Sequence, residues 1–527
     1  MIESPASLAV WNTLLASTAE EMGVTLWRTG HSPNIRERKD FSCAVFNAAG
    51  ELVAQAAHIP VHLGAMPESI SAVSTLAPWK EGDLAIVNDP YLGGTHLPDI
   101  TIVEPVFTDD QLIAFVANRA HHSDIGGMSA GSMPIATELY QEGLIIPPLK
   151  IREAGQLNEP LLALILRNVR TPTERRGDFD AQFGALKTGA TRLKALAYRH
   201  GVRELARWME ALTDYTERLT RAAIESIPDG DYHADDVMES IDGTLLPIRT
   251  KLTVTGDLLT VDFTGSAGEQ SSSINAVSAV TRSAVAYSVR CLLPTNAPSN
   301  AGIFRPIRLL LPESSIVNAM PQRAVSAGNV ETSQRVTDVI LAAFSQALGD
   351  RIPASSAGTM SNFTFGGLHP NGESFAYYET VPGGAGAGPK GRGESGIQTH
   401  MTNTANTPTE SMEITFPVRV RRFELRENSG GKGLHQGGEG VIREIEFLTE
   451  ANVSLVGDRR LIGPPGANGG HSGKKASNTL VSAEGLRKPV SGQQQIQIRP
   501  GDRIEVQTPG GGGWGAPPKG GHRRTAH

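Results

Sequence analysis

Two neighbouring runs of strand-forming residues constrain the fold of this chain more than any other part of its sequence. Residues 100–107 (ITIVEPVF) and 112–118 (LIAFVAN) are rich in β-branched and aromatic side chains, and the polar tetrapeptide TDDQ separates them. This pattern predicts two antiparallel strands joined by a turn. A hairpin brings the residues just before its first strand beside those just after its second strand. The chemistry of these flanking residues therefore indicates what the hairpin can build.

The residues at the open end of this hairpin form a candidate metal site. His96 and Asp99 lie at the start of the first strand, and His121 follows the second. Pro98 disfavours a helical conformation for the residue before it, so His96 and Asp99 come from an extended segment. Two imidazoles and a carboxylate leave coordination positions free on Zn²⁺ or Mn²⁺, which is typical of a catalytic site. Such an ion can lower the pKa of a bound water to roughly 7.

A structural role is the alternative interpretation for each histidine of this chain. It is weaker for the hairpin residues, because an unrelated core rarely needs two histidines and an aspartate at one end of a hairpin. His58 and His62, in HIPVHLG, have a spacing that would suit one face of a helix, but Pro60 interrupts that helix. We expect these two histidines to be mainly structural, with a pocket-lining role as the alternative.

Several longer segments resemble one known family. They are SPNIRERKDFSC (32–43), NDPYLGGTHLPDITIVEPVF (88–107), AHHSDIGG (120–127), THMTNTANTP (399–408) and TPGGGGWG (508–515). They resemble the B-type subunit of the hydantoinase/5-oxoprolinase family, and the resemblance covers nearly the whole chain. This family includes ATP-dependent N-methylhydantoinases, lactamases that act on simple ring lactams and the C-terminal half of eukaryotic-type 5-oxoprolinases. It also includes subunits of acetone and acetophenone carboxylases.

The resemblance implies a fourth metal ligand. In the family members whose sites are understood, a divalent metal is held by four side chains, which correspond here to Asp40, His96, Asp99 and His121. Mixed histidine and carboxylate ligands suit Zn²⁺ or Mn²⁺, and also Fe²⁺. From its own surroundings Asp40 would instead be a surface carboxylate, because Arg36, Arg38 and Lys39 precede it. The ligand role of Asp40 is therefore expected from the resemblance alone.

The resemblance also implies a partner and a reaction. A ring amide has a poorly electrophilic carbonyl and a poor leaving group, so its hydrolysis needs activation. The implied scheme has an A-type subunit of the sugar-kinase-like class that binds ATP and phosphorylates the amide oxygen. The metal site of this chain would then direct hydroxide to the activated carbon, while phosphate leaves. His122 and Asp124 are the expected general base or ligand-orienting groups. Asp89 is a weaker candidate, because an Asx turn before Pro90 explains it as well.

Two other functions remain open from the sequence. The first is a subunit of an ATP-dependent ketone carboxylase, which a requirement for bicarbonate would reveal; a chain of 527 residues is short for a carboxylase large subunit. The second is a non-catalytic scaffold subunit. The ring itself is not specified: hydantoin, N-methylhydantoin, 5-oxoproline and simple lactams are all candidate cyclic amide substrates.

Length and periodicity predict a multidomain, mixed α/β fold. A chain of 527 residues exceeds what one core usually fills. We expect an N-terminal α/β domain with the metal site (1–227), a middle α+β domain (228–414) and a β-sandwich-like domain (415–527). Helices are predicted from Ser4-Pro5 onward and over 173–227, 278–293 and 330–348. Glycine makes up 57 of the 527 residues, a larger share than the usual value of roughly 7%. The glycines beyond residue 415 are interpreted as turns between short strands.

Composition excludes several classes of protein. A net charge of −7 argues against a nucleic-acid partner. No apolar run reaches the roughly 20 residues of a membrane span. Cys43 and Cys291 are the only cysteines, which predicts a reducing, cytoplasmic location. Cys43 is expected to be an inert core thiol, with a nucleophile as the alternative.

The glycine clusters do not complete a nucleotide-binding motif. Gly386, Gly388 and Gly391 satisfy G-x-G-x-x-G, but the residues that follow do not predict a helix. No segment completes the P-loop pattern either. If ATP is used, another chain binds it, so a hetero-oligomer with the A-type subunit is expected.

Overall fold

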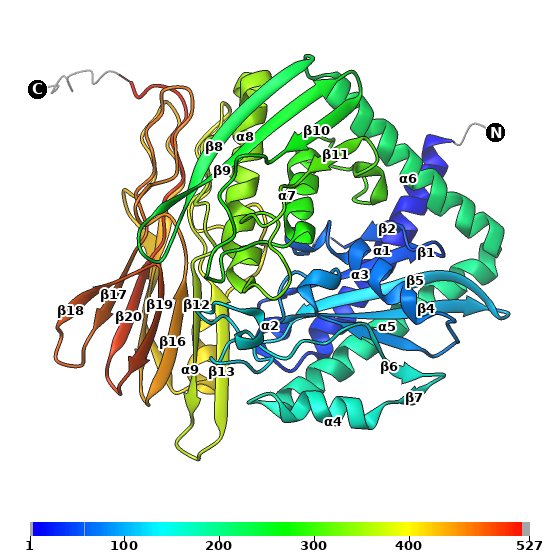
Figure 1. The fold of residues 1–527 in the computed structure, drawn as a ribbon, viewed down its shortest axis with the longest axis horizontal. Coiled ribbons are helices and arrows are strands. Elements are labelled where there is room, and N and C mark those ends of the chain that lie inside the picture. Colours follow the sequence, from blue (N-terminus) through cyan, green and yellow to red (C-terminus); the bar gives the residue numbers. More distant parts are fainter. Residues whose placement is uncertain (1–3, 57, 519–527) are drawn as a thin grey trace, which may run out of the picture.

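A computed structural model describes residues 4–56 and 58–518. These residues form a mixed α/β, multidomain fold, as the sequence predicts. Figure 1 shows three parts side by side: a seven-stranded sheet at the lower right, a four-stranded sheet at the top and a sandwich of two sheets at the left. Within the described residues, none of the helices combines the length and the apolar character that crossing a membrane requires.

The seven-stranded sheet carries the predicted hairpin at its centre. Its strand order is β2-β1-β5-β4-β3-β6-β7, and its pairings are antiparallel. The strands are β1 (Phe41–Asn47), β2 (Leu52–Gln55), β3 (Leu84–Val87), β4 (Asp99–Thr108), β5 (Gln111–His121), β6 (Leu149–Glu153) and β7 (Gln156–Leu157). Asp109 and Asp110 make the turn between β4 and β5, both with positive φ. The hairpin is therefore confirmed, and it pairs Asp99 directly with His121.

Helices cover this sheet and connect it to the next part. They are α1 (Pro5–Thr29), α2 (Pro33–Arg36), α3 (Met66–Val73), α4 (Glu159–Arg167), α5 (Pro172–His200) and α6 (Val202–Glu225). Helix α1 begins as predicted, because the Ser4 side chain accepts a hydrogen bond from the Ser7 backbone N–H and Pro5 occupies the first turn. Helix α1 packs against β1 and α5, and α5 packs against β4 and β5.

The second part is a smaller sheet with two helices packed beside it. Its order is β11-β10-β9-β8, from β8 (Gly230–Glu239), β9 (Leu245–Thr255), β10 (Leu258–Asp262) and β11 (Ile307–Leu310). The helices are α7 (Ser278–Arg290) and α8 (Ser333–Leu348), and α8 packs on β8 and β9. A π-helical turn, Gly328–Thr332, precedes α8. Such turns occur frequently at functional sites.

The third part is the predicted β-sandwich. One sheet has the order β13-β12-β16-β19 and the other has β14-β15-β20-β17-β18. The strands are β12 (Asn362–Leu368), β13 (Ser374–Thr380), β14 (Val418–Arg426), β15 (Gly440–Phe447), β16 (Ala451–Val456), β17 (Ser477–Val481), β18 (Arg487–Val490), β19 (Gln493–Ile498) and β20 (Arg503–Gln507), with the short helix α9 (Thr409–Thr415). Its apolar core includes Phe365, Val453 and Ile504. Strands β12 and β13 precede residue 415, yet β13 pairs with β12 and β12 pairs with β16, so this sheet crosses the predicted boundary.

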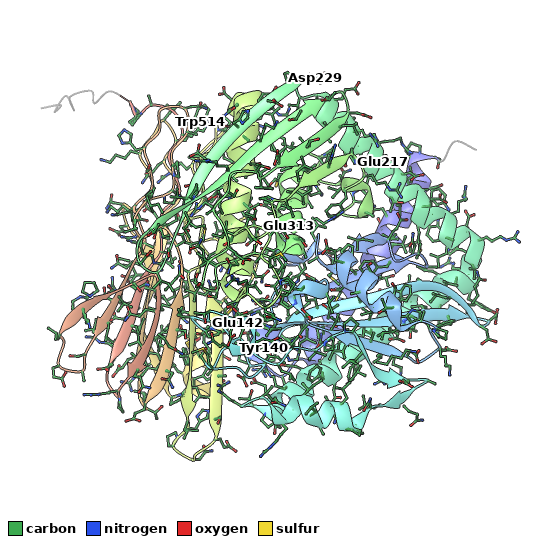
Figure 2. All side chains as sticks on the ribbon, viewed as in Figure 1. Tyr140, Glu142, Glu217, Asp229, Glu313 and Trp514 are labelled. Carbon is green, nitrogen blue, oxygen red and sulfur yellow. The ribbon has the colours of Figure 1, made fainter. Side chains whose placement is uncertain are left out.

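Several glycine-rich segments form a packed bundle, while Gly485 and Gly501 lie in turns between strands as predicted. Successive glycines of the segment 510–513 touch different neighbours: a Cβ on Gly511 would lie 1.9 Å from the Ala385 oxygen, and one on Gly512 would lie 2.0 Å from the Pro465 oxygen. Backbone hydrogen bonds join these segments, including Gly431 N–H to Gly511 O at 2.8 Å. Trp514, which Figure 2 labels, follows this segment and forms a β-bridge with His435. The backbones approach so closely that no side chain fits between them.

The G-x-G-x-x-G segment lies outside any nucleotide-binding turn. Gly388 and Gly391 form an isolated β-bridge. Among the described residues, the next helix along the chain is α9, which has seven residues and begins at Thr409. The structure therefore offers no strand-turn-helix unit at this motif.

Candidate metal centre

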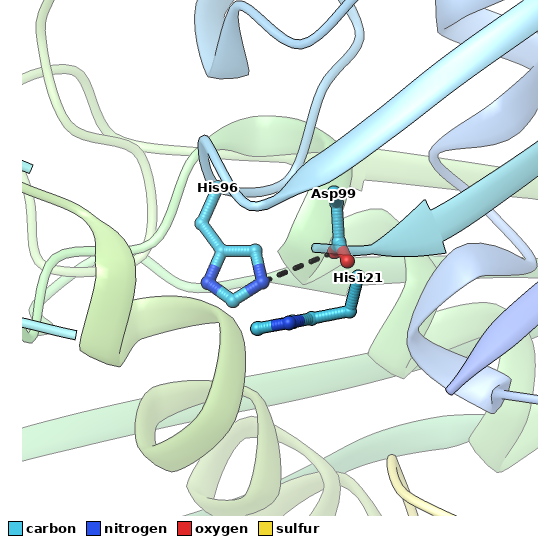
Figure 3. Close-up of side chains that lie close together, drawn as sticks. All are labelled: His96, Asp99 and His121. Carbon is cyan, nitrogen blue, oxygen red and sulfur yellow. Dashed lines mark ion pairs between the residues drawn. The ribbon is translucent and has the colours of Figure 1, made fainter. Parts of the chain in front are cut away.

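The hairpin brings three of the predicted ligands together. His96, Asp99 and His121 each offer a ligand atom, and these atoms lie within 4.8 Å of one another (Figure 3). His96 Nε2 is 3.2 Å from Asp99 Oδ2. All three side chains are buried. Their proximity follows from the strand register, because Asp99 begins β4, His121 ends β5, and the two residues are paired.

His96 is held with one ring nitrogen free. Its Nδ1 lies 3.2 Å from the Ser326 carbonyl oxygen. Since a carbonyl only accepts, Nδ1 carries a proton, which leaves Nε2 as the ring atom that can bind a metal. Among the described residues, Nε2 makes no hydrogen bond of normal geometry, and its polar neighbour is Asp99 Oδ2 at 3.2 Å. The Ser326 peptide is itself fixed, because Glu142 Oε1 accepts the Val325 and Ser326 N–H groups at 2.9 Å each.

His121 is held by stacking and by an amide. Its ring lies flat on the Tyr378 ring, with centroids 4.3 Å apart and an interplanar angle of 7°. Its Nε2, like that of His96, has no hydrogen-bond partner within the described part of the chain. Asn34 Nδ2 lies 3.1 Å from its Nδ1, while Asn34 Oδ1 accepts from Arg38 Nη1 at 3.2 Å. If Nε2 binds a metal, Nδ1 carries the proton, and the Asn34 amide must then turn its oxygen toward His121.

Asp99 is surrounded by donors on one oxygen. His62 Nε2 lies 3.3 Å from Oδ2, Asn329 Nδ2 lies 3.5 Å from it, and the Thr95 hydroxyl also donates to it. Burial raises the pKa of Asp99, but His96 and His62 outweigh it and hold that pKa well below its usual range. Asp99 is therefore an anion, as a metal ligand must be.

Asp40 lies beside this group without being one of the three. It immediately precedes β1, and its backbone oxygen accepts the His121 N–H at 3.0 Å. Its side chain lines the same small cavity as Asp99 and His121. Burial raises the pKa of Asp40 to about 6, against the opposing effect of Arg38, whose Nη1 is 3.5 Å from Asp40 Oδ2. The surface-carboxylate interpretation is wrong, because Asp40 is only 6% exposed.

The cavity at this site has a volume of about 20 Å³. This is room for a water molecule or an ion but not for a ring substrate. Three different parts of the chain line this cavity. They are the seven-stranded sheet with its neighbouring residues, the π-helical turn, and the region of β13. The lining side chains are Asp40, Ile59, Val61, His62, Asp99, His121, Asn329, Val330, Met360, Tyr378, Thr380, Met401, Thr402 and Thr404.

His122 and Asp124 are not among the residues that line this cavity. His122 points to α5, where its Nε2 is 3.0 Å from Gln182 Oε1, and burial lowers its pKa to about 4. Asp124 is buried in an ion pair with Arg170, whose Nη1 donates to its Oδ1 at 2.8 Å. A general-base role for either residue stays a prediction, and these contacts give both of them a structural task.

His62 and His58 have different environments. His62 lines the cavity and contacts Asp99, so the pocket-lining alternative applies to it. Burial lowers the pKa of His62, although Asp99 opposes this effect. His58 lies outside the cavity lining and packs edge-on against Phe41. Pro60 does more than interrupt a helix, because it starts a 3-10 turn over Pro60–His62. This proline is the feature of the sequence that could have indicated the position of His62.

Two other candidates have structural roles. Asp89 Oδ1 accepts the Tyr91 N–H at 3.0 Å, which is the Asx turn that the sequence allowed. Cys43 is fully buried in β1, and burial raises its pKa far above the usual value. Both properties disfavour a nucleophilic thiol.

The donor set suits a divalent transition metal. Two imidazole nitrogens and a carboxylate converge in a buried position, and both nitrogens lack a hydrogen-bond partner within the described residues. A buried polar atom without a partner costs about 1–3 kcal/mol, so two at one point need an explanation. A Zn²⁺, Mn²⁺ or Fe²⁺ ion would satisfy both nitrogens at once.

Comparisons with known proteins agree with the resemblance in the sequence. A family model described as hydantoinase B/oxoprolinase matches residues 4–517. The chain is 39% identical to 5-oxoprolinase 1 of Arabidopsis thaliana, with 97% of this chain and 42% of that protein covered. It therefore spans about two fifths of that relative. It is 31% identical to the B-type subunit of a putative D-/L-hydantoinase from a Pseudomonas species, with 97% and 90% covered.

Solved structures match the whole fold. An ATP-dependent caprolactamase from Pseudomonas jessenii superposes with a TM-score of 0.91 at 27% identity, covering 98% of this chain and 92% of that one. A nucleotide-free acetone carboxylase structure has a TM-score of 0.86 at 18% identity, covering 97% and 76%. At that identity the carboxylase likeness shows the fold alone.

Proposed function

Because the chain belongs to the hydantoinase B/oxoprolinase family, we propose that it is the metal-dependent ring-opening subunit of an ATP-dependent cyclic amide hydrolase. The observation that carries this proposal is the buried group of His96, Asp99 and His121, with two ring nitrogens that make no hydrogen bond of normal geometry in the described part of the chain. A scaffold subunit would have no use for such a group.

We infer that Asp40, His96, Asp99 and His121 hold one divalent transition metal. The three hairpin residues supply converging atoms, and Asp40 lines the same cavity. A metal bound there would lower the pKa of a water molecule, or polarise the carbonyl of a ring substrate once the lining side chains move apart to admit it. The surrounding residues orient the ligands: Ser326 and Tyr378 fix the two rings, and Thr95 and Asn329 donate to Asp99. The apolar side chains of Ile59, Val61 and Met401 keep bulk water away.

Activation of the amide is assigned to an ATP-binding A-type partner. The G-x-G-x-x-G segment lacks the strand-turn-helix unit of a nucleotide site among the residues that the structure describes. The proposal has further support in two names: the similar solved structure is an ATP-dependent caprolactamase, and one relative is the B-type subunit of a putative hydantoinase. The substrate class is a small cyclic amide such as a hydantoin, 5-oxoproline or a lactam, phosphorylated on its amide oxygen before this subunit acts.

Metal content tests the centre directly. Elemental analysis of the purified chain is expected to give about one transition metal per chain, and the double variant Asp99→Asn, His121→Ala is expected to lose it. Asp89→Asn is the matched control, because Asp89 serves a turn outside the cavity. Circular dichroism must show that all three proteins are folded. No metal in the folded wild type, even after incubation with Zn²⁺ or Mn²⁺, would contradict the proposal.

The reaction is tested with the A-type partner, ATP and a panel of hydantoins, 5-oxoproline and lactams. Ring opening is expected without bicarbonate and should be lost in the double variant. Activity on a ketone that depends on bicarbonate would favour the carboxylase. Ring opening that survives in the double variant would favour the scaffold role.

A further inference from the structure

We propose that His62 is a positioning residue of the metal centre, whose Nε2–H group holds Oδ2 of Asp99. The two atoms are 3.3 Å apart, and both side chains are 1% exposed. The inference rests on the function proposed above, because it concerns the same ligand group. His62 is not one of the four proposed metal ligands.

A chain of hydrogen bonds gives the His62 ring one orientation. The Ile59 backbone N–H donates to Ser42 Oγ at 3.3 Å, and Ser42 Oγ lies 2.8 Å from His62 Nδ1. The Asp99 carboxylate only accepts, so His62 Nε2 carries a proton. The Nδ1 of the neutral ring then has a lone pair, which accepts the Ser42 hydroxyl hydrogen. All the bonds run in one direction, from Ile59 through Ser42 and His62 to Asp99.

These contacts distinguish His62 from the proposed ligands. Both of its ring nitrogens have hydrogen-bond partners, namely Ser42 and Asp99. Within the described residues, the Nε2 atoms of His96 and His121 make no hydrogen bond of normal geometry, although His96 Nε2 lies 3.2 Å from Asp99 Oδ2. His62 therefore has no free nitrogen for a metal, whereas the other two histidines have one each. The role of His62 is to hold the Asp99 carboxylate in place beside His96 and His121.

Three separate elements hold this arrangement. Ser42 is on β1, Asp99 begins β4, and His62 ends the 3-10 turn that Pro60 starts. The Val61 backbone N–H, in the same turn, donates to the Met401 oxygen at 3.3 Å. A histidine held from two sides by the fold keeps Asp99 in place before a metal arrives. Such outer partners typically change metal affinity by about 10- to 100-fold when they are removed.

The test is a titration of the metal-free chain with Co²⁺, followed by the visible absorption of the bound ion. We expect His62→Leu to weaken Co²⁺ binding by about 10- to 100-fold. His62→Gln should restore most of the affinity, because a glutamine amide places an N–H where Nε2–H was. His58→Leu is the matched control and should bind as the wild type does, since His58 lies outside the cavity lining. The melting temperature of each metal-free variant reports whether it is folded.

A second variant tests the direction of the hydrogen bonds. Ser42→Ala should weaken Co²⁺ binding in the wild type and have no further effect in His62→Leu, because it acts through the His62 ring. The inference is overturned if His62→Leu binds Co²⁺ as tightly as the wild type. It is also overturned if His62→Gln is as weak as His62→Leu, since the ring itself would then be required. A wild type that binds no Co²⁺ would instead defeat the proposed function as well.

Discussion

At the scale of single residues, Asp40 shows how a site for a cation costs stability when the cation is absent. Its carboxylate is 6% exposed, and burial raises its pKa to about 6. In the unfolded chain the ordinary value is 3.8. The folded metal-free protein therefore holds the proton of Asp40 more tightly than the unfolded chain does, and ionised Asp40 opposes folding at neutral pH.

We predict that Asp40→Asn stabilises the metal-free protein at pH 8 and weakens its metal binding. Asparagine resembles the neutral carboxyl group, so the variant avoids the cost of a buried charge. The gain is about 1–3 kcal/mol above pH 6, and it declines as the pH falls through 6 and vanishes below about 4. Chemical denaturation in the presence of EDTA at pH 8, 6 and 4 measures it.

The matched control for this prediction is Asp124→Asn, because Asp124 is ion-paired with Arg170 at 2.8 Å, whereas Asp40 and Arg38 are 3.5 Å apart and burial outweighs that contact. That variant should destabilise the protein at pH 8, since it removes one partner of a buried ion pair. An Asp40→Asn protein that is less stable than the wild type at pH 8 in EDTA would contradict the burial argument.

Residues of the site could be predicted where their neighbours are close in sequence. His96, Asp99 and His121 belong to one hairpin, so strand pattern and turn length were enough. Asp40 followed only from the family resemblance, because the sequence around it indicates a surface charge. Tyr378 was not found, since it stacks on a histidine more than 250 positions away, and no local pattern records such a contact. His62 was underestimated because its partner Asp99 is 37 positions away.

At the scale of elements, the glycine-rich segments differ most from the prediction. The sequence beyond residue 415 was interpreted as strands with glycine turns, and the strands are there. Gly485 and Gly501 lie in such turns, with positive φ. Other glycines instead form extended segments that hydrogen-bond to one another, such as Gly511 N–H to Gly438 O at 2.9 Å. Single-sequence patterns distinguish strands from turns by side-chain type, and glycine has no side chain to distinguish a turn from a packed extended segment.

We predict that Gly511→Ala destabilises the protein by more than about 3 kcal/mol. The new Cβ would lie 1.9 Å from the Ala385 carbonyl oxygen, and a backbone atom inside a hydrogen-bonded bundle cannot move aside cheaply. Gly391→Ala is the matched control, because a Cβ there meets nothing within 4 Å. Urea denaturation of both variants measures the difference. Equal midpoints for the two variants would show that the bundle yields more easily than its contacts indicate.

At the scale of the whole molecule, the candidate centre is built from all three parts of the fold. The four proposed ligands lie within residues 1–227, but the groups around them do not. Arg38, which is fully buried beside Asp40, donates to Tyr378 O at 3.0 Å and to Thr404 Oγ1 at 3.2 Å. The His96 ring depends on Ser326. Domain boundaries predicted from pattern changes along the chain cannot include such contacts, because they join segments that pattern analysis treats separately.

This arrangement leads to a prediction about the isolated N-terminal fragment. A fragment of residues 1–227 contains every proposed ligand, yet we expect it to bind Co²⁺ at least 100-fold more weakly than the intact chain. Losing one residue that holds a ligand in place typically weakens metal binding by about 10-fold or more, and this fragment lacks several such residues. Removing residues 228–527 takes away the Tyr378 ring that stacks on His121 and the partners of the buried Arg38 guanidinium. Co-expression of the 228–527 fragment is the control and should restore binding if the two pieces assemble. A fragment that binds Co²⁺ as tightly as the intact chain would mean that the hairpin and Asp40 alone make the centre, and that the distant contacts serve only to hold the parts of the molecule together.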